Sequence, residues 1–183
     1  DFHTDSRDDL DAIIHNDLNR NLSLVDHVAD WRRFYAVVNA ASVYMEHVGA
    51  IVGQDMAYSE QNLKWDVAQA RALRALAYFY MARIWGDVPL VTSSYDNGSF
   101  PQIGKSPSSS VLLYAKNELL AAAEELPFQF GSDNNQYYRQ SPSFWQGKLL
   151  NKLSVYAILA HLSAWTGHYA DAETYSAYVL DNY

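Results

Sequence analysis

The chain has no cysteine among its 183 residues. Disulfide bonds, thiolate metal sites and cysteine nucleophiles are therefore excluded, while the redox compartment stays open. The chain also lacks an apolar run near the roughly 20 residues that cross a bilayer, because Arg83 and Asp87 interrupt the longest candidate. We therefore do not expect this chain itself to span a membrane.

Basic residues are few, 13 against 21 acidic residues, and the net charge is −8. No run of Lys or Arg offers a local exception, so nucleic acid is a poor partner. The six histidines include no pair at the spacing of a helical metal site. The acidic cluster at residues 5–11 lacks the glycine and the terminal glutamate of an EF-hand loop. We expect neither a metal nor a cofactor.

Catalytic signatures are also missing: a nucleophile elbow, a phosphate-binding glycine loop and a dinucleotide fingerprint. Glu124 and Glu125 are adjacent on a predicted helix, so their side chains diverge by about 100°. They cannot converge on one bond as a glycosidase carboxyl pair does. The sequence does not indicate an enzyme.

The residues that are present are typical of a folded helical protein, with 49% apolar and 19% charged residues. Spacings of three and four between apolar residues predict helices, and strands are at most minor. The predicted helices cover residues 30–52, with Asp30 as N-cap, and residues 60–85, 108–126, 143–166 and 169–181. Residues 1–29 form a predicted N-terminal irregular segment that allows one helix near residues 8–18. Residues 92–110 and 128–142 form irregular connections.

The last predicted helix pair resembles a tetratricopeptide repeat, a helix-turn-helix unit that must stack on neighbours to bury its apolar side. The matching positions are Tyr156, Leu159, Ala160, Gly167, Tyr169 and Ala172. The sequence therefore predicts an all-α fold, an irregular stack of antiparallel helix pairs over residues 30–183, incomplete at the C-terminus. Because the chain begins without Met and stops on a helical run, we expect it to be part of something longer.

Residues 70–91 carry the most specific pattern, the string ARALRALAYFY followed by IWGDVPLV. This resembles the signature of the SusD/RagB family, in which an Arg-x-x-Arg-Ala helix ends in an aromatic-Gly-Asp-Val-Pro-Leu turn. Three further features agree in order: Trp31-x-x-x-Tyr35-x-x-x-Asn39, a helix ending Glu-Leu-Pro at Pro127, and the repeat-like helix pair. The resemblance covers about residues 30–183.

The resemblance implies a SusD-like, non-enzymatic, lipid-anchored protein on the outer-membrane surface of a Bacteroidetes-type bacterium. It implies binding of an oligosaccharide or a peptide and transfer to a SusC-like TonB-dependent transporter, with membrane attachment only by an N-terminal lipid outside this chain. The alternative is a tetratricopeptide-like protein–protein interaction scaffold without small-ligand binding, favoured by the alanine-rich helices.

The motif residues Arg71, Arg74, Trp85, Gly86, Asp87 and Pro89 are expected to be structural. The two arginines could anchor the turn together with Asp87 through charge-assisted hydrogen bonds; the other reading directs them at an anionic ligand. Aromatic residues at helical spacing are expected to pack between helices, namely Trp31, Tyr35, Trp65, Tyr80, Trp85, Tyr156 and Trp165.

Aromatic residues in irregular segments are the candidates for ligand binding, because exposed rings can stack on the apolar faces of sugars. These candidates are Phe2, Tyr95, Phe100, Tyr137, Tyr138 and Trp145.

Overall fold

The computed structural model describes residues 7–15, 17, 21–95, 101–134 and 136–183. Helices dominate this part of the chain, which confirms the predicted all-α class. The elements in order are α1 Asp8–Ile14, α2 Ser23–Ala29, α3 Arg32–His47, the 3₁₀ turn η1 Val48–Ile51, α4 Glu60–Trp85, β1 Val88–Pro89, β2 Lys105–Ser106, α5 Ser108–Glu125, α6 Pro142–Trp145, α7 Lys152–Trp165 and α8 Tyr169–Asp181.

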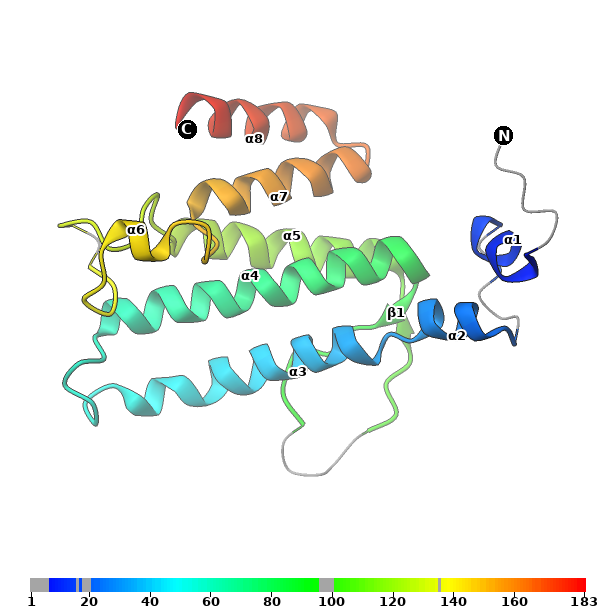
Figure 1. Cartoon of the computed structure of the whole chain (residues 1–183), viewed down its shortest axis with the longest axis horizontal. Coiled ribbons are helices and arrows are strands. Elements are labelled where there is room, and N and C mark those ends of the chain that lie inside the picture. The colour runs from blue at the N-terminus through cyan, green and yellow to red at the C-terminus, as the bar shows by residue number, and fades with distance from the viewer. Residues whose placement is uncertain (1–6, 16, 18–20, 96–100, 135) are drawn as a thin grey trace.

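The long helices α3, α4, α5, α7 and α8 lie side by side in chain order, and each runs opposite to the one before it (Figure 1). This is the predicted stack of antiparallel helix pairs. Helices α1 and α2 stand at one end of the stack, beyond the start of α3 (Figure 1). Within the described residues, no helix combines the length and the apolar character that crossing a membrane requires.

Helix α4 is the centre of the stack, and its boundaries follow local sequence signals. Ser59 caps its start by accepting a hydrogen bond from the backbone N–H of Asn62 at 3.1 Å. Gly86 ends it with a φ of +69°, a conformation that glycine adopts without strain. The small residues predicted to let another helix approach closely are all buried: Ala68, Ala72, Ala75 and Ala82.

Two sequence predictions about the first half of the stack are inaccurate. The segment 1–29 contains a second helix, α2, whose Val25 is fully buried, where we expected irregular chain with a helix only near residues 8–18. The helix predicted from Asp30 begins at Arg32, because the Asp30 carboxylate accepts a hydrogen bond from the Arg32 backbone N–H at 3.0 Å. The α3 helix then ends at His47 rather than near residue 52.

The helix predicted for residues 143–166 is also wrong, because it is two helices, α6 and α7, separated by residues 146–151. Gly147 turns the chain with a φ of +73°. The side chain of Gln69 on α4 accepts a hydrogen bond from Leu150 N at 3.1 Å and donates one to Leu150 O, so tertiary contacts hold the break. Asn151 then caps α7 by accepting a hydrogen bond from Ser154 N at 2.8 Å.

Candidate functional site

A pocket of about 380 Å³ lies between α3 and the irregular chain that follows β1. Three aromatic side chains line it, Trp31, Tyr35 and Tyr95, together with the amide of Asn39. The remaining lining residues are Val38, Pro89, Val91, Pro101 and Ile103. We call this the Tyr95 pocket.

The α3 wall of the Tyr95 pocket follows from residue spacing. Trp31, Tyr35 and Asn39 are four residues apart, which places them on one face of a helix. The rings of Trp31 and Tyr35 meet edge to face with centroids 5.9 Å apart. The W-x-x-x-Y-x-x-x-N pattern seen in the sequence was thus the available signal for this site, although we predicted only packing for the two rings.

The opposite wall of the Tyr95 pocket is held in place by buried hydroxyls and an arginine. Tyr35 donates to Pro89 O at 2.6 Å, and Tyr78 both donates to Val91 O at 2.7 Å and accepts from Val91 N at 2.8 Å. Arg74 donates to Thr92 O at 3.0 Å. Burial raises the pKa of Tyr35 to about 12, so its hydroxyl keeps its proton at neutral pH. The pocket is therefore shaped before any ligand enters.

Tyr95 closes the pocket from the irregular chain. Its backbone N–H donates to Asn39 Oδ1 at 3.2 Å, and its neighbour Ser94 donates from the backbone N–H to Glu46 at 2.8 Å. The side-chain N–H groups of Asn39 make no hydrogen bond to the described residues, so they are available to a ligand oxygen. Two other predicted ligand-binding residues, Phe2 and Phe100, lie outside the described residues.

The arginines of the sequence motif lie in the helix stack and not against Asp87, which corrects our expectation for that turn. Arg74 is buried and donates to Glu118 on α5 at 2.6 Å and to Ser42 on α3 at 2.9 Å. Arg71 lies 3.5 Å from the same Glu118. Asp87 instead accepts a hydrogen bond from Ser108 N at 2.8 Å, which places the turn against the start of α5.

Trp85, also in the motif, packs edge to face on Phe34 and Trp31, with ring centroids 5.4 and 6.3 Å away. Gly86 ends the helix, and Pro89 enters the short ribbon of β1 and β2 opposite Lys105. The ribbon fixes both ends of the chain that carries Tyr95. The motif therefore contributes one wall of the Tyr95 pocket by shaping the backbone.

The other three candidates, Tyr137, Tyr138 and Trp145, come together at the opposite end of α4. The ring centroid of Tyr137 lies 4.5 Å from that of Tyr138 and 4.9 Å from that of Trp145. Tyr137 is only 4% exposed, so it offers no free ring face and we drop it as a stacking residue. Tyr138 is 41% exposed, so part of its ring stays open to solvent.

The Tyr137–Tyr138 pair is organised by a buried carboxylate that sequence reasoning missed. Asp66 on α4, 6% exposed, accepts hydrogen bonds from the hydroxyls of Tyr44, Tyr58, Tyr137 and Tyr138. Desolvation and the hydrogen bond to Asp66 raise the pKa of Tyr58, Tyr137 and Tyr138 well above its ordinary value. No periodicity or motif joins these residues, which are up to 94 positions apart (44 to 138).

Trp145 lines a second pocket, of about 240 Å³, between the segment after α5 and residues 146–151. We call it the Trp145 pocket. It shares no lining residue with the Tyr95 pocket, and the two lie at different ends of the α3–α4 pair (Figure 1). Of the predicted residues, Tyr95 and Trp145 therefore line separate pockets, while Tyr137 lines a groove between α3 and α4.

Two of the aromatics expected between helices are exposed instead. Tyr80 is 42% and Trp165 53% exposed, and the guanidinium of Arg83 lies over both rings, 5.7 and 4.6 Å from their centroids. Trp65 is buried, and Tyr156 packs on Tyr175 and Tyr178 of α8.

Among the described residues, no group of His, Asp and Glu is arranged to hold a metal ion.

Comparison with known proteins shows the family to which this fold belongs. A SusD superfamily protein of Bacteroides thetaiotaomicron, solved as a crystal structure, is 59% identical to this chain and matches 96% of it with a TM-score of 0.87. The chain belongs to the SusD-like family. SusD-like protein P2 of Formosa agariphila is 26% identical to it over 155 residues, 84% of the chain. No family model matches.

This SusD-like chain spans only part of its relatives. It covers 38% of the Bacteroides thetaiotaomicron protein and 27% of SusD-like protein P2. A laminarin-binding SusD-like protein, 23% identical, matches 79% of this chain with a TM-score of 0.64, while the chain covers 28% of it. That likeness extends the shared fold to more distant sequences.

Proposed function

We propose that this SusD-like chain is the helical part of a cell-surface protein that binds oligosaccharides for uptake. The observation that carries the proposal is the Tyr95 pocket, where aromatic faces and an amide meet in a pre-formed hollow. Aromatic rings pack against the apolar faces of sugars, while a few polar groups fix their hydroxyls. Support also comes from the shared fold with a laminarin-binding SusD-like protein.

The proposed role is binding without turnover, because the Tyr95 pocket has aromatic and amide groups but no carboxylate pair in its described lining. Residues outside this chain would complete the site. We further propose that the intact protein is anchored by an N-terminal lipid on the outer membrane of a Bacteroidetes-type bacterium. It would pass its cargo to a SusC-like TonB-dependent transporter, and a gene for a large β-barrel transporter beside this one would support that.

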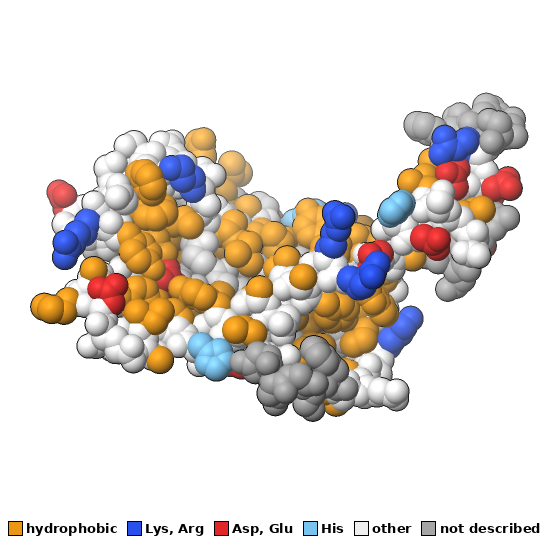
Figure 2. Space-filling view, turned by 60° about the horizontal axis from the view of Figure 1, so that its bottom comes forward, with side chains coloured by type: hydrophobic (Ala, Val, Ile, Leu, Met, Phe, Trp, Pro, Cys, Tyr) orange, Lys and Arg blue, Asp and Glu red, His pale blue; other side chains and the backbone are white. Residues whose placement is uncertain are grey.

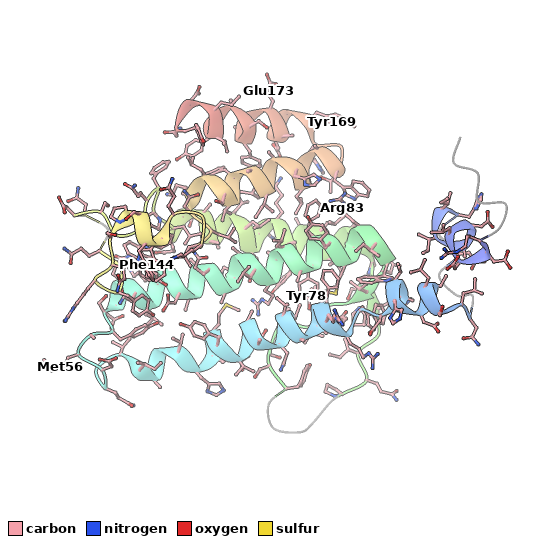
Figure 3. The ribbon with its side chains drawn as sticks, in the orientation of Figure 1. Met56, Tyr78, Arg83, Phe144, Tyr169 and Glu173 are labelled. Atoms are coloured by element: carbon pink, nitrogen blue, oxygen red, sulfur yellow. The ribbon has the colours of Figure 1, made fainter. Side chains whose placement is uncertain are left out.

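The test is calorimetry on the full-length protein with an array of neutral oligosaccharides, including laminari-oligosaccharides, and of peptides. We expect saccharide binding, weakened about tenfold by Tyr95→Ala, a loss of about 1.4 kcal/mol. Tyr169→Ala is the matched control, because Tyr169 is 73% exposed at the start of α8, and Figure 3 shows it on the outermost helix of the stack. Binding of peptides alone, or equal effects of the two variants, would contradict the proposal.

A protein-interaction scaffold is the second candidate, favoured by one observation. Hydrophobic side chains gather in large patches on one face of the molecule (Figure 2), and a mainly apolar groove of about 390 Å³ runs between α3 and α4. Val37 and Leu73, which line the groove, are 43% and 46% exposed. If scaffolding is the function, Leu73→Glu will abolish partner binding and no saccharide will bind at all.

A further inference from the structure

The Trp145 pocket differs from the Tyr95 pocket in its polar lining. Three side-chain amides, Gln129, Gln146 and Asn151, share it with the rings of Phe128 and Trp145. Phe128 is 44% exposed. A volume of about 240 Å³ is below the roughly 300–1,000 Å³ of pockets that enclose drug-sized ligands. It therefore suits one sugar ring of a chain better than a long segment.

The walls of the Trp145 pocket are tied together by hydrogen bonds. Asn151 donates from its amide to Phe128 O at 2.9 Å, and Lys152 donates from its backbone N–H to Pro127 O, also at 2.9 Å. The indole N–H of Trp145 donates to Tyr137 O at 3.1 Å, which fixes the plane of that ring. The pocket is thus pre-organised, which reduces the entropy lost on binding.

Two of the amides remain available to a ligand. The side chains of Gln129 and Gln146 make no hydrogen bond to any residue that the structure describes. Each amide has N–H donors and a carbonyl acceptor. Sugar hydroxyls also both donate and accept hydrogen bonds, so the two kinds of group match. A ligand with several hydroxyls would satisfy them.

Two lysines, Lys148 and Lys152, each follow a lining residue of this pocket, Gly147 and Asn151, in the chain. The ammonium of Lys152 lies 5.7 Å from the ring centroid of Phe128, and that of Lys148 lies 3.8 Å from the ring centroid of Phe144. Phe144 in turn packs edge to face on Trp145, with centroids 4.7 Å apart. Phe144 belongs to α6, and Figure 3 shows it at the end of the molecule where α4 begins. Neither ammonium forms an ion pair within the described part of the chain.

The described lining of the pocket is free of acidic residues, although the whole protein is acidic. No carboxylate is among its described lining residues. Glu124 and Glu125 line a different hollow, which they share with Lys64 and Arg71. The carboxylate of Asp66 is already surrounded by tyrosine hydroxyls.

We propose that the Trp145 pocket binds a hexuronate, a sugar ring that carries a carboxylate, within an acidic oligosaccharide. The inference rests on the proposed saccharide-binding function and names the substrate class of a second site. The aromatic rings contact the sugar, Gln129 and Gln146 bind its hydroxyls, and Lys148 and Lys152 attract the carboxylate. A lysine ammonium is a compact, hydrated point charge. It can therefore attract a carboxylate that stays in contact with solvent, without the fixed two-bond geometry of an arginine.

The test is calorimetry on the full-length protein with oligogalacturonate, oligomannuronate and oligoglucuronate, each compared with its neutral methyl ester. We expect at least one uronate to bind, about tenfold more tightly than its ester, with an affinity that falls as salt is added. The double variant Lys148→Gln, Lys152→Gln should remove that preference. Lys64→Gln, an exposed lysine in the hollow with Glu124, is the matched control and should retain it.

The outcomes separate this inference from the proposed function. Laminari-oligosaccharide binding that depends on Tyr95, with no uronate binding, overturns the inference and leaves the function standing. No binding of any saccharide overturns both. Equal affinity for uronate and ester, or lysine-dependent binding of a poly-glutamate peptide that matches the uronate, overturns the assignment to a hexuronate. Unchanged thermal unfolding of the lysine variants checks that they fold.

Discussion

Tyr58, in the loop before α4, donates its hydroxyl hydrogen to the carboxylate of Asp66 across 2.8 Å. Both side chains are buried, and Tyr44, Tyr137 and Tyr138 complete the ring of hydroxyls around the same carboxylate. The cluster joins α3, the α3–α4 loop, α4 and the segment before α6. It therefore positions the chain that leads to Trp145.

Asp66→Asn should lower the free energy of unfolding by about 2 kcal/mol or more. An amide places an N–H donor where hydroxyl donors converge, and hydrogen bonds to a charged acceptor contribute about 1.5–3 kcal/mol. Urea unfolding measures the change. Asp171→Asn is the control. The side chain of Asp171 is 44% exposed and pairs with Lys116, so losing this ion pair should lower the free energy of unfolding much less. Equal effects of the two variants would contradict the role of the cluster.

Arg74→Met should destabilise the stack by about 3–5 kcal/mol, because it leaves Glu118 largely buried without its main partner. The side chains of Arg74 and Glu118 are only 9% and 13% exposed. Arg71→Met removes the more distant, 35% exposed partner of the same carboxylate and should cost less than about 1 kcal/mol. Chemical denaturation of both variants checks the difference, and a mild effect of Arg74→Met would show that α3 and α5 do not depend on it.

Gly131→Ala should distort the approach to the Trp145 pocket and cost more than about 2 kcal/mol, since strain at positive φ adds to a steric clash. Gly131 has a φ of +80°, and a Cβ there would lie 2.5 Å from Gln140 O. Gly167→Ala is the matched control: its φ of +78° is similar, but nothing lies within 4 Å of the added Cβ, so about 1 kcal/mol is expected. Thermal unfolding that ranks the two variants in the opposite order would refute this account.

Raising the pH should destabilise the wild-type protein more than Tyr35→Phe between about pH 10 and 12. The pKa of Tyr35 is about 12 when folded and about 10 when unfolded. The unfolded chain therefore loses its phenol proton first, and the stability that this group contributes below pH 10 is lost as the pH rises. Unfolding free energies across this range, with phenolate absorbance, provide the measurement. Parallel pH profiles for the two proteins would exclude the raised pKa of Tyr35.

The sequence by itself determined most of the long helices and their order, because each signal is local. Apolar spacing marked the helices at residues 60–85 and 108–126, which are α4 and α5, and Gly86 ends α4. The string from Arg71 to Pro89 also pointed to the family that comparison then showed.

Tertiary structure alone decided which residues meet. Glu118 is the partner of Arg74 because α5 packs on α4, and Gln69 holds the chain that interrupts the predicted helix at Gly147. Asp66 gathers four tyrosines from three segments, and of these Tyr137 is buried while Tyr138 is exposed. Such contacts depend on the packing of elements distant in the chain, which no local pattern encodes. The sequence therefore offered a set of aromatic residues as site candidates, and the fold placed two of them, Tyr95 and Trp145, in separate pockets.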